Sequence, residues 1–306
     1  MIYDLAILGG GPAGAAAAVY AARKRLKSVL ITKDWLGQSY SSEGIENWIG
    51  TIKISGLDLS KSLEAHAKAY ADGIIDFREG ELAGLVTRTT EGFTVKTDKG
   101  SYSARAILVA TGSSRRKLDV PGAAEYDNKG VVYCASCDGP LYADQDVVVV
   151  GGGNAGFETA AQLMAYCRSV TLVNRTENFK ADPGTVEAVS KNPKVKIITG
   201  AIPKAVKGAK FVTGYVYTDT KTGKDVELPV TGIFVEIGSI PNTDYIKEIV
   251  KLDPYNRVMI DHKNQRATDG VWAAGDVTDG LYHQNNIAAG DAIRALEDIY
   301  LYLKAK

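Results

Sequence analysis

Two cysteines three positions apart offer the most direct chemistry in the sequence. They lie in the segment Cys134-Ala-Ser-Cys137-Asp138, shortly before a glycine-rich turn that begins at Gly151. Thiols at this spacing can close a small, reducible disulfide ring, and the thiolate is the form that attacks another disulfide. Most free thiols are protonated at neutral pH, so the adjacent Asp138 can accept and donate the proton. The segment favours a redox dithiol in which Cys134, Cys137 and Asp138 are catalytic, although Asp138 can instead be a turn residue before Gly139-Pro140.

A structural zinc site and two merely buried cysteines are the alternatives for this motif. Structural zinc needs four ligands, and the rest of the chain offers only Cys167 and three histidines scattered in sequence. Cys167 lies at an apolar position late in an expected helix, which is typical of a small buried core residue. We therefore predict no metal site and favour the redox dithiol.

Two glycine-rich turns predict two dinucleotide sites. The first runs from Gly9 to Gly14 and the second from Gly151 to Gly156, each after an apolar run and before a helical segment. In such a motif the glycines permit a tight turn, close approach of a pyrophosphate and close packing of helix on strand. The pyrophosphate then lies at the helix N-terminus. Glycine-rich turns in an ordinary α/β sheet are the alternative, but two matched motifs are a stronger signal than one.

The surroundings of these turns form an internal repeat. The order strand, glycine turn, helix, strand occurs at 4–32, with its helix at 12–25, and again at 146–173, with its helix at 154–167. Alternating segments, turns and apolar strands follow in both halves, at 92–110 and 211–237. We therefore predict an α/β fold of two Rossmann-like dinucleotide-binding domains, each a three-layer ββα unit with an inserted β-meander.

A short strand and helix at the end of the chain, within 270–303, cannot stand alone as a domain. We expect them to return to the first unit, which makes the first domain discontinuous. The predicted domains are 1–117 with 244–306, and 118–243, and the second carries the dithiol.

The bulk composition is that of an ordinary globular chain, with 306 residues, 45% hydrophobic residues and a formal net charge of zero. No basic stripe indicates nucleic-acid binding, and no apolar run reaches the roughly 18 residues of a membrane helix. The first residues enter a strand without a signal peptide, and three cysteines cannot build a secreted disulfide scaffold. We expect a cytoplasmic enzyme that binds neither nucleic acid nor membrane.

The strand before residue 174 ends without a carboxylate, which bears on the choice of nucleotide. An acid at this position binds ribose hydroxyls, whereas basic residues accommodate a 2′-phosphate. The segment Asn174-Arg175-Thr176, followed by Lys180, therefore favours NADPH over NADH. Glu177 lies among these residues and weakens the inference, and Arg175 and Lys180 can instead be ordinary surface charges.

Together these motifs resemble the low-molecular-weight thioredoxin reductase family, and equally the reductase core of the alkyl hydroperoxide reductase flavoprotein. The resemblance covers essentially the whole chain. It is carried by Gly9–Gly14, Glu46–Gly50, Ala110–Gly112, Cys134–Leu141, Gly151–Gly156, Gly275-Asp276 and His283-Gln284. The ending Cys-Asp-Gly-Pro-Leu, with Gly232–Gly238 and Ile240–Thr243, leans towards the branch that serves a peroxidase.

The resemblance implies FAD in the first domain, NAD(P)H in the second, and a homodimer. It also implies that Cys137 lies near the flavin, that Cys134 attacks the partner disulfide and that Asp138 moves the proton. The implied FAD-binding residues are Gly9, Gly11, Pro12, Ala13, Gly14, Thr32, Lys33, Gln38, Asn47, Ala110, Thr111, Gly112, Gly275, Asp276, His283 and Gln284. The implied NAD(P)H-binding residues are Gly151, Gly153, Asn154, Ala155, Asn174, Arg175, Thr176, Lys180, Ile237 and Gly238.

The chain departs from both branches at the nucleotide clamp. Thioredoxin reductases usually carry His-Arg-Arg and a further Arg where this chain has Asn174-Arg175-Thr176 and Lys180, and the peroxidase branch usually carries Glu at 174. Gly156 is often Ala in thioredoxin reductases, a change we expect to be harmless. The peroxidase-linked flavoproteins also have an N-terminal thioredoxin-like module, so here we expect electrons to leave to a separate protein.

We therefore predict a flavin-dependent thioredoxin-disulfide reductase that passes electrons from NADPH through FAD and Cys134–Cys137 to a thioredoxin-like protein. The alternatives are a glutaredoxin-like or peroxiredoxin partner with NADH, a ferredoxin-driven reductase, a dithiol oxidase and a redox sensor. Because the dithiol and the nicotinamide site share one domain, we expect that domain to rotate about its two connections.

Overall fold

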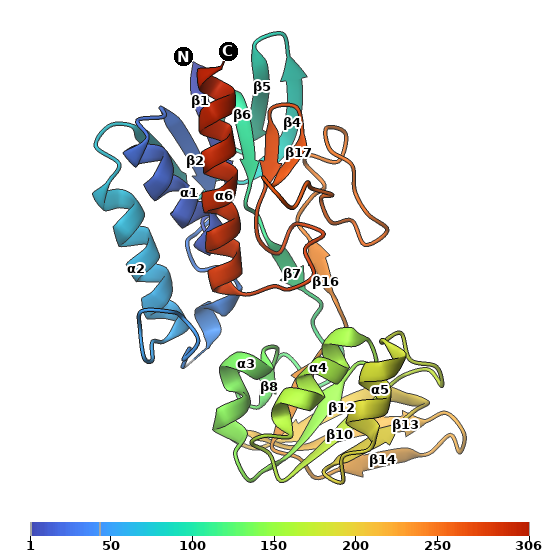
Figure 1. Ribbon diagram of the computed structural model, residues 1–306. Helices are drawn as coiled ribbons and strands as arrows, with labels where there is room; N and C mark the ends of the chain where they lie inside the picture. The colour runs from blue at the N-terminus through green and yellow to red at the C-terminus, as the bar shows by residue number, and fades with distance from the viewer. Residues whose placement is uncertain (1, 43, 306) are drawn as a thin grey trace. The chain divides into compact units, whose positions relative to one another are not determined.

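The chain folds into two compact units in the computed structural model, which describes residues 2–42 and 44–305 (Figure 1). The first unit comprises Met1–Ser41, Trp48–Ser114 and Ile240–Lys306, and the second comprises Ser42–Asn47 and Arg115–Ser239. These limits differ from the predicted 1–117, 118–243 and 244–306. The chain leaves and re-enters the first unit within two short strands, β7 (Ser113–Arg115) and β16 (Ser239–Pro241), which pair with each other. Sequence alone placed 42–47 in the first domain, and this segment groups with the second unit instead.

The first unit is built on an eight-stranded sheet with a parallel centre. Its helices are α1 (Pro12–Arg23), η1 (Gln38–Ser41), α2 (Gly56–Ala69) and α6 (Asn285–Lys304). Its strands are β1 (Ile2–Leu8), β2 (Ser28–Thr32), β3 (Ile75–Glu79), β4 (Ala83–Thr89), β5 (Gly92–Thr97), β6 (Ser101–Val109), β17 (Arg266–Thr268) and β18 (Val271–Ala273). The order is β17-β18-β6-β1-β2-β3, and the antiparallel pair β4 and β5 joins through β6.

Alternation along β1 divides this unit into three layers. Leu5 and Ile7 belong to a core shared with α1, α2 and α6, which lie on the same side of the sheet (Figure 1). Ala6 and Leu8 belong to the core on the opposite face, beneath β4 and β5. A strand turns successive side chains to opposite faces, so one apolar run supplies both cores.

The second unit repeats this architecture with a smaller sheet. Its helices are α3 (Ala135–Asp138), η2 (Gly139–Tyr142), α4 (Asn154–Leu163) and α5 (Pro183–Ser190). Its strands are β8 (Val131–Val132), β9 (Asp146–Val150), β10 (Ser169–Val173), β11 (Val195–Ile198), β12 (Ala201–Gly208), β13 (Val212–Asp219), β14 (Asp225–Leu228) and β15 (Gly232–Val235). The parallel sheet runs β11-β10-β9-β15-β8, and β12-β13-β14 form the separate antiparallel meander.

Layers form in the second unit by the same alternation. Val147 and Val149 of β9 pack with residues of α4 and α5, whereas Val148 and Val150 pack with the meander. The predicted α/β fold with two Rossmann-like units, each with an inserted meander, is therefore confirmed. The sequence predicts that helix α4 reaches Cys167, but it ends at Leu163. The N–H groups of Ala165 and Tyr166 donate to carbonyls three positions back, those of Gln162 and Leu163, at 3.2 and 3.1 Å, so the chain tightens into a turn there.

No helix in 2–42 or 44–305 has the length and apolar character needed to cross a membrane.

Asp298 joins α6 to the far edge of the first sheet. Its Oδ2 accepts hydrogen bonds from Nε1 of Trp272 at 2.8 Å and from Nη2 of Arg266 at 2.7 Å. Trp272 is completely buried, so the indole N–H has no route to water. This contact holds the terminal helix on the unit that it completes.

We expect Asp298→Ala to lower the free energy of unfolding of the first unit by about 2 to 3 kcal/mol, because it strands a buried indole N–H and a half-buried guanidinium. Urea denaturation measures the change. Glu297→Ala is the matched control, since Glu297 forms an ion pair with Lys24 at the surface, and we expect a change within about 0.5 kcal/mol. Equal effects of the two substitutions would contradict this role of Asp298.

Candidate functional site

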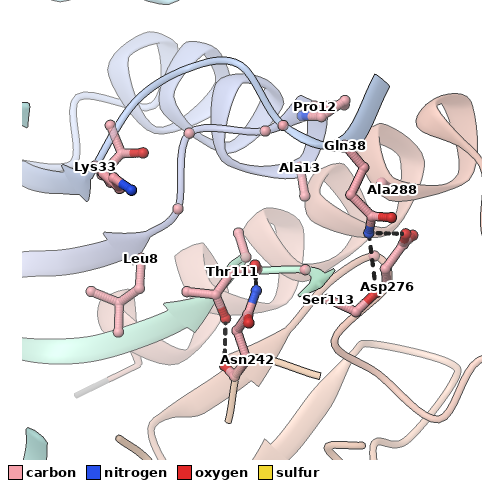
Figure 2. Close-up of a pocket in the computed structure, with 18 of the residues that line it drawn as sticks. Leu8, Pro12, Ala13, Lys33, Gln38, Thr111, Ser113, Asn242, Asp276 and Ala288 are labelled. Atoms are coloured by element: carbon pink, nitrogen blue, oxygen red, sulfur yellow. Dashed lines mark hydrogen bonds between the residues drawn. The ribbon is translucent and has the colours of Figure 1, made fainter. Parts of the chain in front are cut away.

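A pocket of about 570 Å³ opens at the carboxyl ends of the central strands of the first unit (Figure 2). The ends of parallel strands in doubly wound sheets are where such folds bind dinucleotides, and this volume is that of a typical ligand site. The lining includes most of the residues predicted to bind FAD, namely Gly9, Gly11, Pro12, Ala13, Thr32, Lys33, Gln38, Ala110, Thr111, Gly112, Gly275 and Asp276.

In the first glycine turn, backbone atoms pack so closely on Gly9 and Gly14 that neither position has room for a side chain. A Cβ on Gly9 would overlap the carbonyl of Ala110 at the end of β6, and a Cβ on Gly14 would overlap the carbonyl of Gly9. The helix α1 therefore packs directly on the turn. A Cβ on Gly11 would instead enter open space, which leaves room for a pyrophosphate at the N-terminus of α1. The turn fits a dinucleotide.

Gln38 links two parts of the pocket wall. Its Nε2 donates to Oδ2 of Asp276 at 3.1 Å and to Oγ of Ser113 at 3.0 Å (Figure 2). Asp276 follows Gly275, whose φ of 75° is in the left-handed region and whose Cβ would collide with Ala288 on α6. Only glycine permits this turn, and the turn brings the Asp276 carboxylate into the wall of the pocket.

Four predicted FAD-binding residues are absent from this lining. Gly14 lies behind the turn, where it packs against Gly9. Asn47 is exposed and belongs to the segment that groups with the second unit. His283 and Gln284 are exposed residues directly before α6. Within the first unit, His283 and Gln284 therefore do not join the glycine turn in lining the pocket.

The pocket also contains residues that sequence reasoning did not single out. Nδ2 of Asn242 donates to the carbonyl of Thr111 at 2.8 Å, and the Thr111 hydroxyl donates to the carbonyl of Asn242 at 2.9 Å. The hydroxyl of Tyr245, which burial keeps protonated by raising its pKa, lies 3.0 Å from that of Thr111. Glu81, between β3 and β4, completes this wall. The Pro-Asn-Thr sequence at the end of β16 is a usable signal for Asn242, whereas no sequence motif indicates Glu81.

The second glycine turn reproduces the first, residue for residue. A Cβ on Gly151 would overlap the carbonyl of Glu236 at the end of β15, and a Cβ on Gly156 would overlap the carbonyl of Gly151. A Cβ on Gly153, at the N-cap of α4, would again enter open space. The turn is therefore shaped for a second dinucleotide. The overlap at Gly156 also corrects the expectation that alanine is harmless there, since the backbone would have to move.

The loop after β10 folds back over this turn. The backbone N–H of Lys180 donates to the carbonyl of Gly152 at 3.0 Å, and the N–H of Asp182 donates to Oδ1 of Asn154 at 2.7 Å. The Asn174 side chain is buried, and its Nδ2 donates to the carbonyls of Thr176 and Asn178. Asn174 thus shapes the loop from inside.

The basic and acidic side chains of this loop are separated. Arg175, Thr176 and Lys180 are exposed on it. Glu177 turns to β11 and the meander, where its Oε2 accepts from Thr199 at 2.8 Å and lies 3.4 Å from Nζ of Lys221. The Thr199 hydrogen bond and the Lys221 cation lower the pKa of Glu177. The Glu177 carboxylate is therefore already engaged, which removes the objection that it neutralises Arg175.

Glu236 is a titratable group that sequence reasoning passed over. It follows β15, its carboxylate Oε1 accepts the hydroxyl hydrogen of Thr159 on α4 at 2.8 Å, and its carbonyl packs on Gly151. Burial raises its pKa to about 7, against a smaller opposite effect of Arg115. A signal did exist, since a glutamate interrupts an otherwise apolar strand end.

The two motif cysteines form a disulfide at the start of α3, a helix that contacts the C-terminal end of α4 through a hydrogen bond from Ser136 to Gln162. Cys134 and Cys137 are bonded, with their Cα atoms 5.3 Å apart. Cys134 is the N-cap of α3, and its Sγ accepts the backbone N–H of Cys137 at 3.2 Å. Such a hydrogen bond favours the thiolate form of that sulfur after reduction. Asp138 follows directly, and Oγ of Ser42 donates to its Oδ1 at 3.4 Å.

The third cysteine has a different environment. Cys167 is completely buried, and burial raises its pKa to about 11. A thiol held protonated in an apolar core is inert. Within the described residues, no group of three or more His, Cys, Asp and Glu side chains is arranged to hold a metal ion.

Several known proteins are similar to this chain in sequence and in fold. A model of the family described as pyridine nucleotide-disulphide oxidoreductase matches residues 3–292. The F subunit of alkyl hydroperoxide reductase in Pseudomonas putida is 39% identical over 296 residues, which are 96% of this chain and 56% of that protein. Its counterpart in Staphylococcus aureus is 37% identical over 98% of this chain and 59% of its own length. The chain therefore spans little more than half the length of these curated relatives.

Two solved structures match over nearly their full length. The thioredoxin reductase of Streptococcus pyogenes is 31% identical, with a TM-score of 0.89 over 100% of this chain and 99% of that chain. The thioredoxin reductase of Giardia duodenalis is 30% identical, with a TM-score of 0.91 over 99% of both chains.

The open space at Gly11 and Gly153 predicts a matched pair of variants. We expect Gly11→Val to fold, because both turns have extended backbone at these positions, but to be purified without flavin, because the side chain fills the first pocket. We expect Gly153→Val to keep flavin and to lose at least tenfold in affinity for the pyridine nucleotide. Absorbance at the flavin band and nucleotide titration measure the two losses. Stoichiometric flavin in Gly11→Val would contradict the assignment of this pocket.

Proposed function

Because the chain belongs to the pyridine nucleotide-disulphide oxidoreductase family, which implies a flavin and a pyridine nucleotide, we propose that it is a flavin-dependent disulfide reductase. The flavin is FAD, held by the pocket at the first glycine turn, and the pyridine nucleotide binds at the second. When bound, the flavin accepts a hydride from the reduced nucleotide and delivers two electrons to a disulfide. The observation that carries the proposal is the Cys134–Cys137 disulfide on the unit that also holds the second turn.

The dithiol produced by that reduction is the chain's own reagent. The thiolate of Cys134 attacks one sulfur of the partner disulfide and forms a mixed disulfide, which releases the partner's other sulfur as a thiolate. The thiol of Cys137 then loses its proton, attacks Cys134 and restores the intramolecular disulfide. The partner leaves as a dithiol, so two electrons and two protons have passed to it.

Asp138 and the N-cap geometry support these roles. The backbone N–H of Cys137 donates to the sulfur of Cys134, which favours the thiolate at the position that attacks. The carboxylate of Asp138 lies next to Cys137 in the chain and takes or returns its proton. We also propose that the second unit alternates between two orientations about its two connections, so that Cys137 and the nucleotide reach the flavin in turn.

NADPH is the nucleotide that we propose. The exposed Arg175 and Lys180 lie on the loop that covers the second turn, and Glu177, the acid between them in the chain, is engaged by Thr199 and Lys221. A guanidinium fork suits a 2′-phosphate. The substrate class is a thioredoxin-like disulfide protein, by analogy with the solved structures that the fold matches.

The second candidate is a reductase that serves a peroxiredoxin with NADH. It is favoured by the 39% identity to the F subunit of alkyl hydroperoxide reductase. The loss of any carboxylate at the end of β10 disfavours NADH. The homodimer and the cytoplasmic location implied by the resemblance remain predictions, as does a glutaredoxin-like partner.

We expect Cys134→Ser and Cys137→Ser to abolish reduction of a thioredoxin disulfide, while NADPH still bleaches the flavin, because only the dithiol step is lost. Anaerobic flavin absorbance and insulin-coupled thioredoxin reduction measure the two steps. Cys167→Ala is the control, and its turnover should match that of the wild type because its thiol is buried and protonated. Normal thioredoxin reduction by either serine variant would overturn the proposed dithiol.

We expect Arg175→Ala to raise the KM for NADPH about tenfold and to leave the KM for NADH nearly unchanged, because the guanidinium contacts only the 2′-phosphate. Steady-state kinetics with both nucleotides measure the ratio. Lys191→Ala removes the same charge from an exposed ion pair on α5 and should change neither KM. A parallel rise in both values for Arg175→Ala would show that Arg175 does not read the phosphate.

A further inference from the structure

The internal repeat isolates one acidic group that the second site has and the first lacks. The carbonyl that meets the first glycine of the turn belongs to Ala110 in the first unit and to Glu236 in the second. The backbone carbonyls of Ala110 and Glu236 make the same contact with the turn, so the carboxyl group of Glu236 is not required to shape it. Its presence at the proposed nucleotide site therefore calls for another explanation.

The surroundings of Glu236 balance two opposite charges. Its carboxylate is half-buried and accepts one hydrogen bond, from Thr159 of α4 at 2.8 Å. Arg115 of β7 and Glu158 of α4 are the charged side chains that act on it, the first favouring and the second opposing ionisation. The threonine hydroxyl can remain hydrogen-bonded to either form of the carboxyl group, so the site accommodates both.

We propose that Glu236 is a positioning residue whose carboxyl group must be neutral for tight binding of the pyridine nucleotide, so that binding takes up one proton. This inference rests on the proposed function, because it requires the nucleotide to bind at the second turn. The proton comes from solvent and converts the carboxylate of Glu236 to the acid, with no bond formed or broken in the nucleotide.

Electrostatics give the reason. The pyrophosphate would lie at Gly153 and the N-terminus of α4. The backbone carbonyl of Glu236 packs on Gly151 of the same turn, and its carboxylate is bonded to Thr159 of α4. A partly buried negative charge beneath α4 repels a pyrophosphate at the start of that helix, whereas the neutral acid does not. Burial already raises the pKa of Glu236 to about 7, so protonation costs little near neutral pH.

We expect the affinity for the nucleotide to fall as the pH rises through 7. Well below pH 7 the carboxyl group of Glu236 is already neutral and the nucleotide binds at full affinity. Well above pH 7 the carboxyl group is ionised and must take up a proton on binding, so the Kd increases. With a pKa of about 7, we expect the Kd to rise about tenfold between pH 6 and pH 8.

The experiment is calorimetric titration of the flavin-loaded protein with NADP⁺, which binds without turnover. Titration at pH 7.5 in two buffers of different ionisation enthalpy measures the protons taken up, and we expect about 0.8 proton for the wild type. Glu236→Gln mimics the neutral acid and should take up none, with a Kd at pH 8 close to the wild-type value at pH 6. Glu236→Ala copies the first unit and should behave likewise, should glutamine disturb the fold.

Two controls separate Glu236 from its neighbours. The 2′-phosphate of NADP⁺ titrates near pH ~6, and its contribution is common to all variants and is removed by taking differences. Glu187→Gln deletes an exposed carboxylate of α5 that pairs with Lys191 and is not among the charges that act on Glu236, and we expect its proton uptake to equal that of the wild type.

Three results would overturn the inference. Equal proton uptake by the wild type and both Glu236 variants would assign the proton to another group. Binding of NADP⁺ by the wild type without proton uptake would contradict the inference and leave the proposed function intact. Failure of both NADP⁺ and NAD⁺ to bind the wild type would contradict the proposed function itself, and the inference with it.

Discussion

Both sites depend on one backbone contact, in which the first turn of a helix packs directly against the glycine turn that follows the preceding strand. In both units the turn folds so tightly that a glycine Cα lies against a carbonyl, Gly14 on Gly9 and Gly156 on Gly151. This contact orients the first N–H groups of the helix, which have no partner within the helix, into the space above Gly11 and Gly153. Every other feature of the two sites is arranged around that space.

Because the glycine turn and its helix occur twice, one chain can carry two sites with different chemistry. The first unit surrounds the turn with strand ends, with Lys33 and Glu81, and with the Gln38–Asp276 hydrogen bond. The second replaces the corresponding walls with the loop that carries Arg175 and with the carboxyl group of Glu236. Because the backbone is the same, the differences in binding reside in side chains at the strand ends. Comparison of the repeats therefore distinguishes groups that shape a turn from groups that act on a ligand.

The dithiol occupies the second unit rather than the first, and this placement governs the proposed reaction. Cys134 follows β8 in the chain and is the N-cap of α3, where a backbone N–H can stabilise its thiolate. A partner disulfide must meet the same sulfur that later re-forms the bond with Cys137. The proposed alternation of the second unit has a separate reason: the nucleotide and the dithiol lie on one unit, and each must reach the same flavin.

The sequence by itself determined the fold class, the strands at 28–32, 146–150 and 169–173, the glycine turns and the cysteine pair. These features depend on local chemistry: apolar alternation, glycine conformation and thiol spacing. Only the tertiary structure decided that Glu177 faces Lys221, that Asn242 and Glu81 line the first pocket, and that Glu236 is half-buried beneath α4. Such relations join segments far apart in the chain, and the pKa of a carboxyl group depends on burial and neighbouring charges that no local pattern contains.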